Sequence, residues 1–243
     1  MKTKQILLIS FLLILAICCY VEPVLAAPGG AIAKGLFKSF WGKVLLAVLT
    51  IVLLPFILYI RLREYFGVKK TKKILEKLGT KNRDFQLLNL QKEVKNVYQR
   101  VHVAWDKEKM DEVADYVTNW YWQNQQLVYL DEWNRKGLKN VCKVKSYDSV
   151  KPLYIAVSEE NNYEGSKIAF SITADMEDYL VEKETGNVVE GKPGYDSIEK
   201  VWIMEYTENG WRLDDIHEGS MSLAFAKLEN VVPQTVKASL GIA

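Results

Sequence analysis

Two long apolar runs begin the chain, before any regular alternation of polar and apolar positions. The first, Gln5–Val21, follows two lysines and precedes small residues ending at Ala26, an order typical of a signal peptide. The second, Val44–Ile60, has no charged residue, and its seventeen positions would span about 25 Å as a helix. We therefore expect a cleaved signal peptide (or an uncleaved first transmembrane helix) over 1–26, a short segment outside the cytoplasm over 27–43, and a transmembrane helix over 44–60.

Positive charge is distributed unequally around the second run. Three lysines lie between Ala26 and this run, and nine Lys and Arg residues follow it, up to Arg83. The richer side of a membrane helix faces the cytoplasm, so the rest of the chain is predicted to lie there, at a cell (inner or plasma) membrane. The same cations could contact anionic lipid, each contributing about 1 kcal/mol. The candidates for lipid contact are Arg61, Arg63, Lys69, Lys70, Lys72 and Lys73.

Helical spacing follows the membrane segment. A basic helix over Arg61–Leu78, ended by Gly79, and a short linker would fill the region 61–83. Asp84 suits a helix N-cap, and apolar steps of three and four from Leu87 to Trp105 predict the first helix of a domain. A second helix over Met110–Tyr121 and a shorter third one near Gln123–Lys136 are expected next.

The period then changes to two. Alternation predicts strands around Val141–Tyr147, Leu153–Val157, Ile168–Met176, Val201–Tyr206 and Trp211–Ile216. Asn209-Gly210 between the last two predicts a tight hairpin turn. Helices followed by an antiparallel meander predict an α+β domain over 84–218, with N-terminal helices packed on one face of a curved sheet. The region 219–243 is expected as a C-terminal tail.

Charge and residue usage exclude several classes of function. From Ala27 to Arg83, 12 Lys and Arg residues face two acids, whereas from Asp84 onward 18 face 27 acids. A nucleic-acid-binding domain should itself be basic, so no nucleic acid is expected as a partner. Cys142 is the single thiol of the domain and is expected to be buried in a reducing compartment. The two histidines supply no metal-ligand spacing, so neither a metal nor a cofactor is predicted.

Aromatic residues are the strongest candidates for a site. Five of them could line a pocket or a partner surface, or could form ordinary core: Trp105, Tyr121, Phe170, Trp202 and Trp211. The rings of Trp120-Tyr121-Trp122 cannot all face one core, so one should lie at a domain edge or a partner surface. His102 and His217 are expected at the surface. The sequence contains no Gly-rich phosphate loop, nucleophile elbow or paired-carboxylate motif.

Several of these residues carry a resemblance to a known family. Ala104-Trp105-Asp106, Tyr121, Thr185–Gly191, Glu199, Trp202, Trp211, Leu213 and Ile216 occur in the order and spacing of the C-terminal domain of the mitochondrial inner-membrane translocase subunit forty-four. The resemblance covers about Asp84–Glu218. It implies the conical fold of nuclear transport factor 2, in a bacterial membrane-anchored member, and a scaffold rather than an enzyme. The chaperone-binding segment of the mitochondrial proteins is absent, so import-motor activity is not carried over.

Two classes of function remain open. The favoured one is a membrane-tethered scaffold or adaptor that binds a protein or peptide at the cytoplasmic face, linked to protein translocation or membrane-protein assembly. The alternative is a small-ligand-binding or enzymatic pocket of the same conical fold. A pocket with His217 or Asp214 at its floor would favour the alternative. A filled cone with an exposed apolar patch would favour the scaffold.

Overall fold

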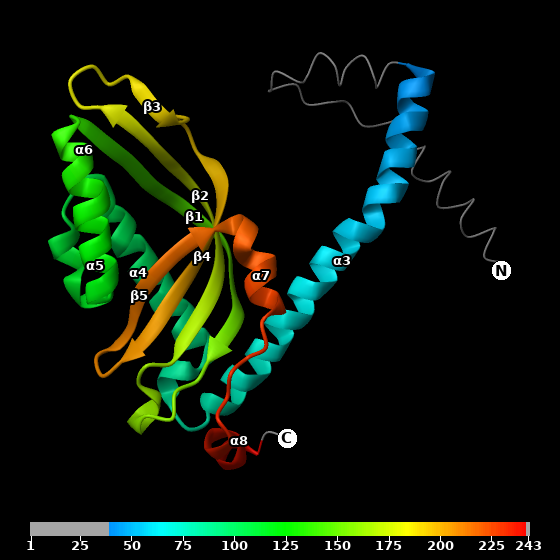
Figure 1. Cartoon of the computed structure of the whole chain (residues 1–243), viewed down its shortest axis with the longest axis vertical. Helices are drawn as coiled ribbons and strands as arrows, with labels where there is room; N and C mark the ends of the chain where they lie inside the picture. Colours follow the sequence, from blue (N-terminus) through cyan, green and yellow to red (C-terminus); the bar gives the residue numbers. More distant parts are fainter. Residues whose placement is uncertain (1–38, 242–243) are drawn as a thin grey trace. The chain divides into compact units, whose positions relative to one another are not determined.

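The computed structural model describes residues 39–241 of the chain. Its contacts divide the chain into two units, Met1–Leu62 and Arg63–Ala243, and each is described by itself. The expected signal peptide over 1–26 and most of the expected segment 27–43 lie outside the described residues. The described part of the first unit is the beginning of one long helix, and the second unit contains all the remaining elements (Figure 1).

Helix α3 (Phe40–Leu78) includes the whole of the apolar run Val44–Ile60, with Pro55 inside it. It is long and apolar enough to cross a membrane, by length and composition. Leu45, Val52 and Phe56 are more than half exposed to the surroundings. A row of exposed apolar side chains has an unfavourable free energy in water, and a lipid environment would remove this cost.

The last turns of α3 belong to the second unit. Leu75 and Leu78 are fully buried in its core. The Thr71 hydroxyl donates a hydrogen bond of 3.0 Å to the carbonyl of Leu153. Gly67 lies so close to the backbone of Ala226 that no Cβ would fit. The helix predicted over Arg61–Leu78 therefore forms, but its second part is packed into the fold, which starts earlier than the expected boundary at Asp84.

Helix α4 (Leu87–Lys107) forms where helical spacing predicted it. Its buried stripe contains Leu90, Val94, Val97 and Val101 at steps of three and four. The capping residue is different from the expected one. Asn82 accepts a hydrogen bond from the amide of Asp84 and caps the short 3₁₀ helix η1 (Arg83–Phe85), which precedes α4.

The expected second helix over Met110–Tyr121 is wrong as a single element. It is divided into the 3₁₀ segment η2 (Met110–Tyr116) and helix α5 (Asn119–Asn124). Val117 between them is extended and pairs with Leu213, while the amide of Thr118 donates to the Leu213 carbonyl at 2.8 Å. The Thr118 hydroxyl then caps α5. The π-helical segment η3 (Gln125–Leu130) and helix α6 (Asp131–Arg135) continue from α5.

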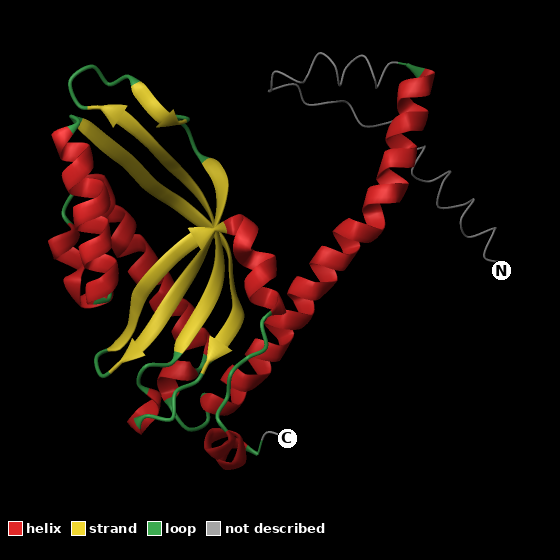
Figure 2. Cartoon of the chain, viewed as in Figure 1, coloured by secondary structure: helices red, strands yellow, loops and turns green. Residues whose placement is uncertain are grey.

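The sheet is antiparallel, with strand order β1-β2-β4-β5 and a short β3 paired to β2. The two strands expected over 141–147 and 153–157 are one long strand with three register shifts, and such bulges bend a strand. Figure 2 shows the resulting long, curved ribbons. The predicted hairpin forms, but its two loop residues are Glu208 and Asn209, one position earlier than expected, because Gly210 already pairs with Thr207 as the first residue of β5. The strands are β1 (Leu138–Ala156), β2 (Lys167–Glu182), β3 (Val188–Gly191), β4 (Asp196–Thr207) and β5 (Gly210–Glu218).

Helices cover both faces of this sheet. The main core lies between the sheet, α4 and the segment α5–η3–α6, whereas a smaller cluster on the other face joins Leu153, Ala169 and Val201 to Ala226 of α7. The mixed α+β class is confirmed, but the expectation of helices on one face alone is not. The remaining short elements are η4 (Asn161–Tyr163), η5 (Gly219–Met221), α7 (Ser222–Lys227) and α8 (Gln234–Leu240).

The C-terminal region 219–241 is part of the fold. The Glu199 carboxylate accepts hydrogen bonds of 2.7 Å from the hydroxyls of Ser171 in β2 and Ser222 in α7. Val236 of α8 is buried in the main core, and Lys77 of α3 donates to the backbone carbonyl of Gly241 at 2.6 Å. These contacts tie the end of the chain to the sheet and to α3.

Candidate functional site

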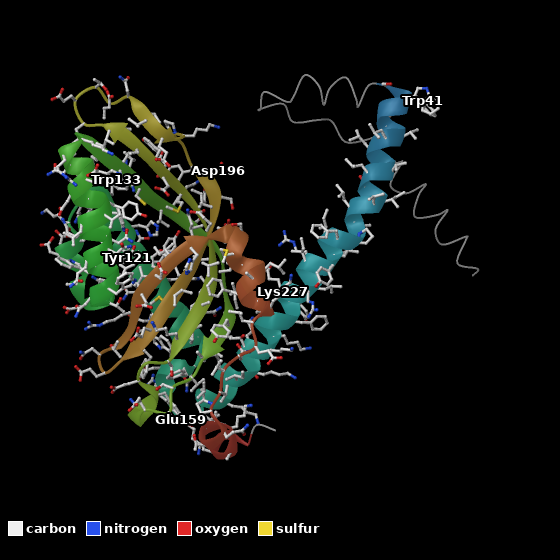
Figure 3. All side chains as sticks on the ribbon, viewed as in Figure 1. Trp41, Tyr121, Trp133, Glu159, Asp196 and Lys227 are labelled. Atoms are coloured by element: carbon white, nitrogen blue, oxygen red, sulfur yellow. The ribbon has the colours of Figure 1, made fainter. Side chains whose placement is uncertain are left out.

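A cavity of about 260 Å³ opens between the helices and the inner face of the sheet. One wall comes from α4, a second from the segment α5–η3–α6, and the floor from strands β1, β2, β4 and β5. Figure 3 labels Tyr121 and Trp133 on the second wall. The lining residues are Val101, His102, Trp105, Tyr121, Gln125, Tyr129, Trp133, Asn140, Cys142, Met176, Asp178, Lys200, Trp202 and Ile216.

Three aromatic rings pack against one another where the two helical walls meet: Trp105 of α4 with Tyr129 of η3 and Trp133 of α6. The ring centroids of Trp105 and Trp133 are 5.5 Å apart, those of Tyr129 and Trp133 are 5.7 Å apart, and those of Trp105 and Tyr129 are 6.2 Å apart. The ring planes are inclined to one another by 56° to 65°. Tyr129 is 40% exposed, so this wall reaches the surface and the cavity is open to it. We call these three residues the aromatic wall.

The second wall depends on the π-helical segment. Tyr121, Gln125, Tyr129 and Trp133 all line the cavity and are four positions apart. In a regular α-helix a step of four overshoots a full turn by about 40°, so four such residues would spiral away from one face. The wider turns of η3 offset this drift. The π segment therefore keeps the residues after Tyr121 directed towards the cavity.

The floor of the cavity contains one carboxylate, Asp178, and one lysine, Lys200, whose charge is paired with an acid. Asp178 of β2 lines the cavity where it opens to the surface, and its Oδ1 is 3.5 Å from the Asn140 side-chain nitrogen, at the limit of a hydrogen bond. Desolvation raises the pKa of the Asp178 carboxyl above its ordinary value. The Lys200 ammonium is 2.8 Å from the Glu218 carboxylate, which neutralises it.

His102 is held neutral at the base of the cavity, and its expected position at the surface is wrong. Its ring lies 4.0 Å from the Tyr98 ring and stacks on Trp202 at 5.5 Å. Nδ1 lies 2.8 Å from the Tyr98 carbonyl, which can only accept, so Nδ1 donates and Nε2 stays an acceptor. Burial lowers the pKa of His102 to about 4. At neutral pH the ring therefore adds no charge to the cavity.

Cys142 is buried, as its residue type predicted, and it forms part of the floor. Burial raises the pKa of its thiol above the ordinary value. A thiol with a raised pKa holds little thiolate at neutral pH and is a poor nucleophile. Cys142 is therefore an apolar surface of the cavity.

The aromatic candidates from the sequence divide into two groups. Trp105, Tyr121 and Trp202 line the cavity. Phe170 and Trp211 do not, because Phe170 is fully buried in the main core and Trp211 packs against Phe85. The residue pattern could not separate these groups, since core and cavity walls use the same side chains.

Several cavity residues were missed by sequence reasoning. Gln125, Tyr129 and Trp133 repeat the four-residue step from Tyr121, and this spacing was the available signal. For Asp178 the signal was the alternation of Ile172, Ala174 and Met176 along β2, which continues to position 178 and places a carboxylate on the inward face.

Other candidates lie outside the cavity. Asp214 binds the Lys167 ammonium at 2.6 Å, and His217 lies 3.3 Å from Asp215 on β5. Among the cations expected to contact lipid, Lys72 is partly buried in α3. Arg61 belongs to the first unit, and the exposed cations of this set in the second unit are Arg63, Lys69, Lys70 and Lys73.

Exposed apolar side chains lie along α5 and η3, outside the cavity. Trp120 is 65% exposed, which confirms that one ring of the Trp120-Tyr121-Trp122 run lies at a domain edge. Leu127 and Val128 of η3 are also more than half exposed, and Tyr129, which lines the cavity, follows them in the chain. We call Trp120, Leu127 and Val128 the apolar rim.

Comparisons with known proteins leave the chain without an identified family. No family model matches it, and no curated protein matches it. Among solved structures, it is similar to the crystal structure of the intermembrane space region of the chloroplast protein ARC6. The match has 9% identity and a TM-score of 0.36, and covers 53% of this chain and 93% of that one. A likeness at this level identifies neither a family nor a function.

Proposed function

We propose that this protein is a membrane-tethered scaffold whose folded unit binds a protein or peptide partner through the aromatic cavity and the apolar rim. The observation that carries the proposal is the aromatic wall, which is open to the surface and two of whose residues, Tyr129 and Trp133, belong to the same helical segment as the exposed apolar rim. Aromatic anchors in pockets, surrounded by apolar surface, are the usual basis of protein recognition.

The size of the cavity supports a partner side chain as its occupant. Pockets for whole small molecules usually enclose about 300–1,000 Å³. This cavity of about 260 Å³ lies below that range, and it suits one side chain or a similarly small group. The apolar rim would extend the contact beyond the inserted group.

The titratable groups support binding over catalysis. A general base works best with a pKa near the working pH, whereas the pKa of His102 is lowered to about 4. The Cys142 thiol has a raised pKa and Asp178 lies where the cavity opens. The alternative function, a ligand-binding or enzymatic pocket, is favoured by one observation: the free Nε2 of His102 and the Asp178 carboxylate line the same cavity.

The proposal includes a family and a shape. The resemblance to the C-terminal domain of translocase subunit forty-four, and through it to the cone of nuclear transport factor 2, is supported by the order of elements, helices before a bulged antiparallel sheet. Trp105, Tyr121 and Trp202 belong both to the residues that carry the resemblance and to the cavity lining. A role near protein translocation or membrane-protein assembly follows from the resemblance alone.

The membrane side is proposed from charge. Nine Lys and Arg residues between Ile60 and Asp84, against three between Ala26 and Val44, support a cytoplasmic folded unit. Lys69, Lys70 and Lys73 are exposed on α3, as contact with anionic lipid would require. A reporter that is active only outside the cytoplasm, fused at Ala243, should stay silent, and a bright signal would contradict this side.

Site-specific photo-crosslinking in membranes tests the scaffold. A photoreactive residue at Leu127, in the apolar rim, should give a discrete adduct with a partner. The same residue at Leu88, which is 81% exposed and does not line the cavity, is the matched control. Trp133→Ala in the Leu127-labelled chain should remove the adduct. Equal adducts from both positions, or an adduct that persists in the Trp133→Ala chain, would contradict binding through the cavity.

A further inference from the structure

The charges around the cavity are not balanced. Asp178 lies on the floor, and within residues 39–241 no Lys, Arg or His nitrogen is within ion-pair distance of it. The Lys200 ammonium is already paired with Glu218. Neutral His102 supplies no charge. The cavity therefore presents one carboxylate that has no ion-pair partner among the described side chains.

The ring faces of the aromatic wall attract positive charge. The face of an aromatic ring carries negative potential and its edge positive potential, and indole attracts cations most strongly. Two indoles and one phenol line the cavity here, and their planes are inclined to one another by 56° to 65°. The Trp105 Nε1 edge is directed to the Tyr121 hydroxyl at 3.4 Å, so its positive end is occupied inside the protein.

We propose that the cavity recognises an alkylammonium group, held against the faces of Trp105, Tyr129 and Trp133 and facing the carboxylate of Asp178. This inference rests on the proposed function and names the chemistry of the group that enters. An anion would meet Asp178 with no free cation to bind it, and a neutral apolar group would gain nothing from the carboxylate at the opening of the cavity. A quaternary or tertiary ammonium satisfies both the rings and the acid.

The volume is consistent with this group. A trimethylammonium head has four heavy atoms, a nitrogen and three methyl carbons. A cavity of about 260 Å³ accommodates it together with part of the alkyl chain that carries it. The head could belong to a free small molecule or to an alkylated lysine of a partner protein. Both sources present the same cation, and the two arms of the experiment distinguish them.

The first arm measures binding of choline to the full chain by calorimetry. The protein is held in a maltoside detergent, since phosphocholine detergents carry the group under test. The matched control ligand is 3,3-dimethylbutan-1-ol, in which carbon replaces the nitrogen without a change in shape. Choline should bind at least about tenfold more tightly than this neutral isostere, a difference of about 1.4 kcal/mol. Equal binding, or no binding of choline, would overturn the proposal.

Four variants locate the site. Asp178→Asn and Trp133→Leu should each weaken choline binding at least about tenfold. Glu177→Gln, the neighbouring acid on β2, and Trp41→Leu, the exposed tryptophan of α3, are the matched controls and should bind as the parent does. Near-ultraviolet circular dichroism checks that each variant is folded. Unchanged binding in folded Asp178→Asn, or equal losses in the two controls, would overturn the assignment.

The second arm titrates a short peptide with one trimethyllysine, against the same peptide with norleucine. Tighter binding of the trimethyllysine peptide than of choline would assign the cation to a protein partner, and the reverse would assign it to a small molecule. The two proposals can fail separately. If choline does not bind while the Leu127 adduct still depends on Trp133, the ammonium is wrong and the scaffold stands. If choline binds and no adduct forms, the scaffold is wrong.

Discussion

In the described part of the chain, Phe85 contacts three aromatic rings and Trp133 contacts two, yet the first cluster is closed to solvent and the second is open. Phe85 contacts Tyr206 at 5.0 Å and Trp211 at 5.1 Å, edge to face, and is fully buried. Trp133 has similar distances to its neighbours but lies beside a cavity. Ring distances alone therefore do not distinguish a packed core from a binding wall.

Polar atoms make the distinction. In the Phe85 cluster, the Trp211 indole nitrogen donates to the Asp84 carbonyl at 3.1 Å, and the Tyr206 hydroxyl donates to the Asp84 carboxylate at 2.7 Å. Near Trp133, the closest comparable bond is the one of 3.4 Å from Trp105 to Tyr121. A cluster with short internal bonds stabilises the fold, whereas one with long bonds and an open side retains capacity for a ligand.

The largest expected effect concerns the last turns of α3, which contribute to the same core as Phe85. A fragment beginning at Arg63 should fold, whereas one beginning at Asp84 should lose more than about 4 kcal/mol of unfolding free energy, because the buried side chains of Leu75 and Leu78 are removed. Urea denaturation of the two fragments measures the difference. Equal midpoints would show that α3 contributes nothing to the closed cluster.

The next largest effects are expected from single substitutions, which should lower the unfolding free energy by different amounts in the two clusters. Phe85→Ala should lower the unfolding free energy by about 3–5 kcal/mol, because it leaves a cavity among closed rings. Trp133→Ala enlarges a space that already exists, and we expect a loss below about 1 kcal/mol. Chemical denaturation of the full second unit compares them. Similar losses in both variants would mean that the two clusters are equally packed.

Acidification tests whether the base of the cavity is as dry as the stacking of His102 indicates. The pKa of His102 is about 4 in the folded chain and about 6.5 in the unfolded chain, so between these values the unfolded chain binds more protons. Unfolding free energy should therefore fall by up to about 3 kcal/mol from pH 7 towards pH 4. His102→Gln should remove this part of the slope, and His217→Gln should retain it. Identical slopes in all three proteins would place His102 in water.

The smallest effect is expected at Asp178. Its pKa is raised by desolvation, so its charged form disfavours the folded state, and the loss grows as pH rises through the folded pKa. Asp178→Asn should raise the melting temperature slightly at pH 7, and the gain should vanish below about pH 4. Besides burial, the groups that act on the pKa of Asp178 are Asn140 and Lys200, which lower it, and Glu218 and Glu190, which raise it. A lower melting temperature at pH 7 would show that the carboxylate stabilises the fold.

Local patterns predicted the elements that depend on local patterns. The periodicity of α4 and the hairpin turn between β4 and β5 required no information from elsewhere in the chain. The prediction of a single second helix was wrong because Val117 pairs with Leu213 on β5. The residues around Val117 give no local signal for this pairing. Tertiary hydrogen bonding overrode helical periodicity at one residue and divided the element.

The site was predictable by residue type and not by position. Trp105 and Trp202 were recognised as pocket candidates because aromatic side chains line pockets, and the same reasoning selected Trp211, which is core. Asp178 was missed because the alternation along β2 was followed only as far as Met176. The next residue on the same face is position 178. His102 was misplaced because the stacking partner Trp202 is distant in the sequence.

The π-helical segment holds one more residue than a regular helix with the same direction would. Removing one residue between Gln125 and Leu130 would convert the wide turns of η3 into regular α-helical turns. Trp133 would then lie eleven positions from Tyr121, about 20° beyond three full turns at 100° per residue, and would still be directed towards the cavity. A second deletion would have no wide turn left to offset it, and would rotate every later residue of the helix by about 100° relative to Tyr121. Related chains that are one residue shorter here can therefore keep the same cavity, whereas chains that are two residues shorter lose Trp133 from it although no cavity side chain is substituted.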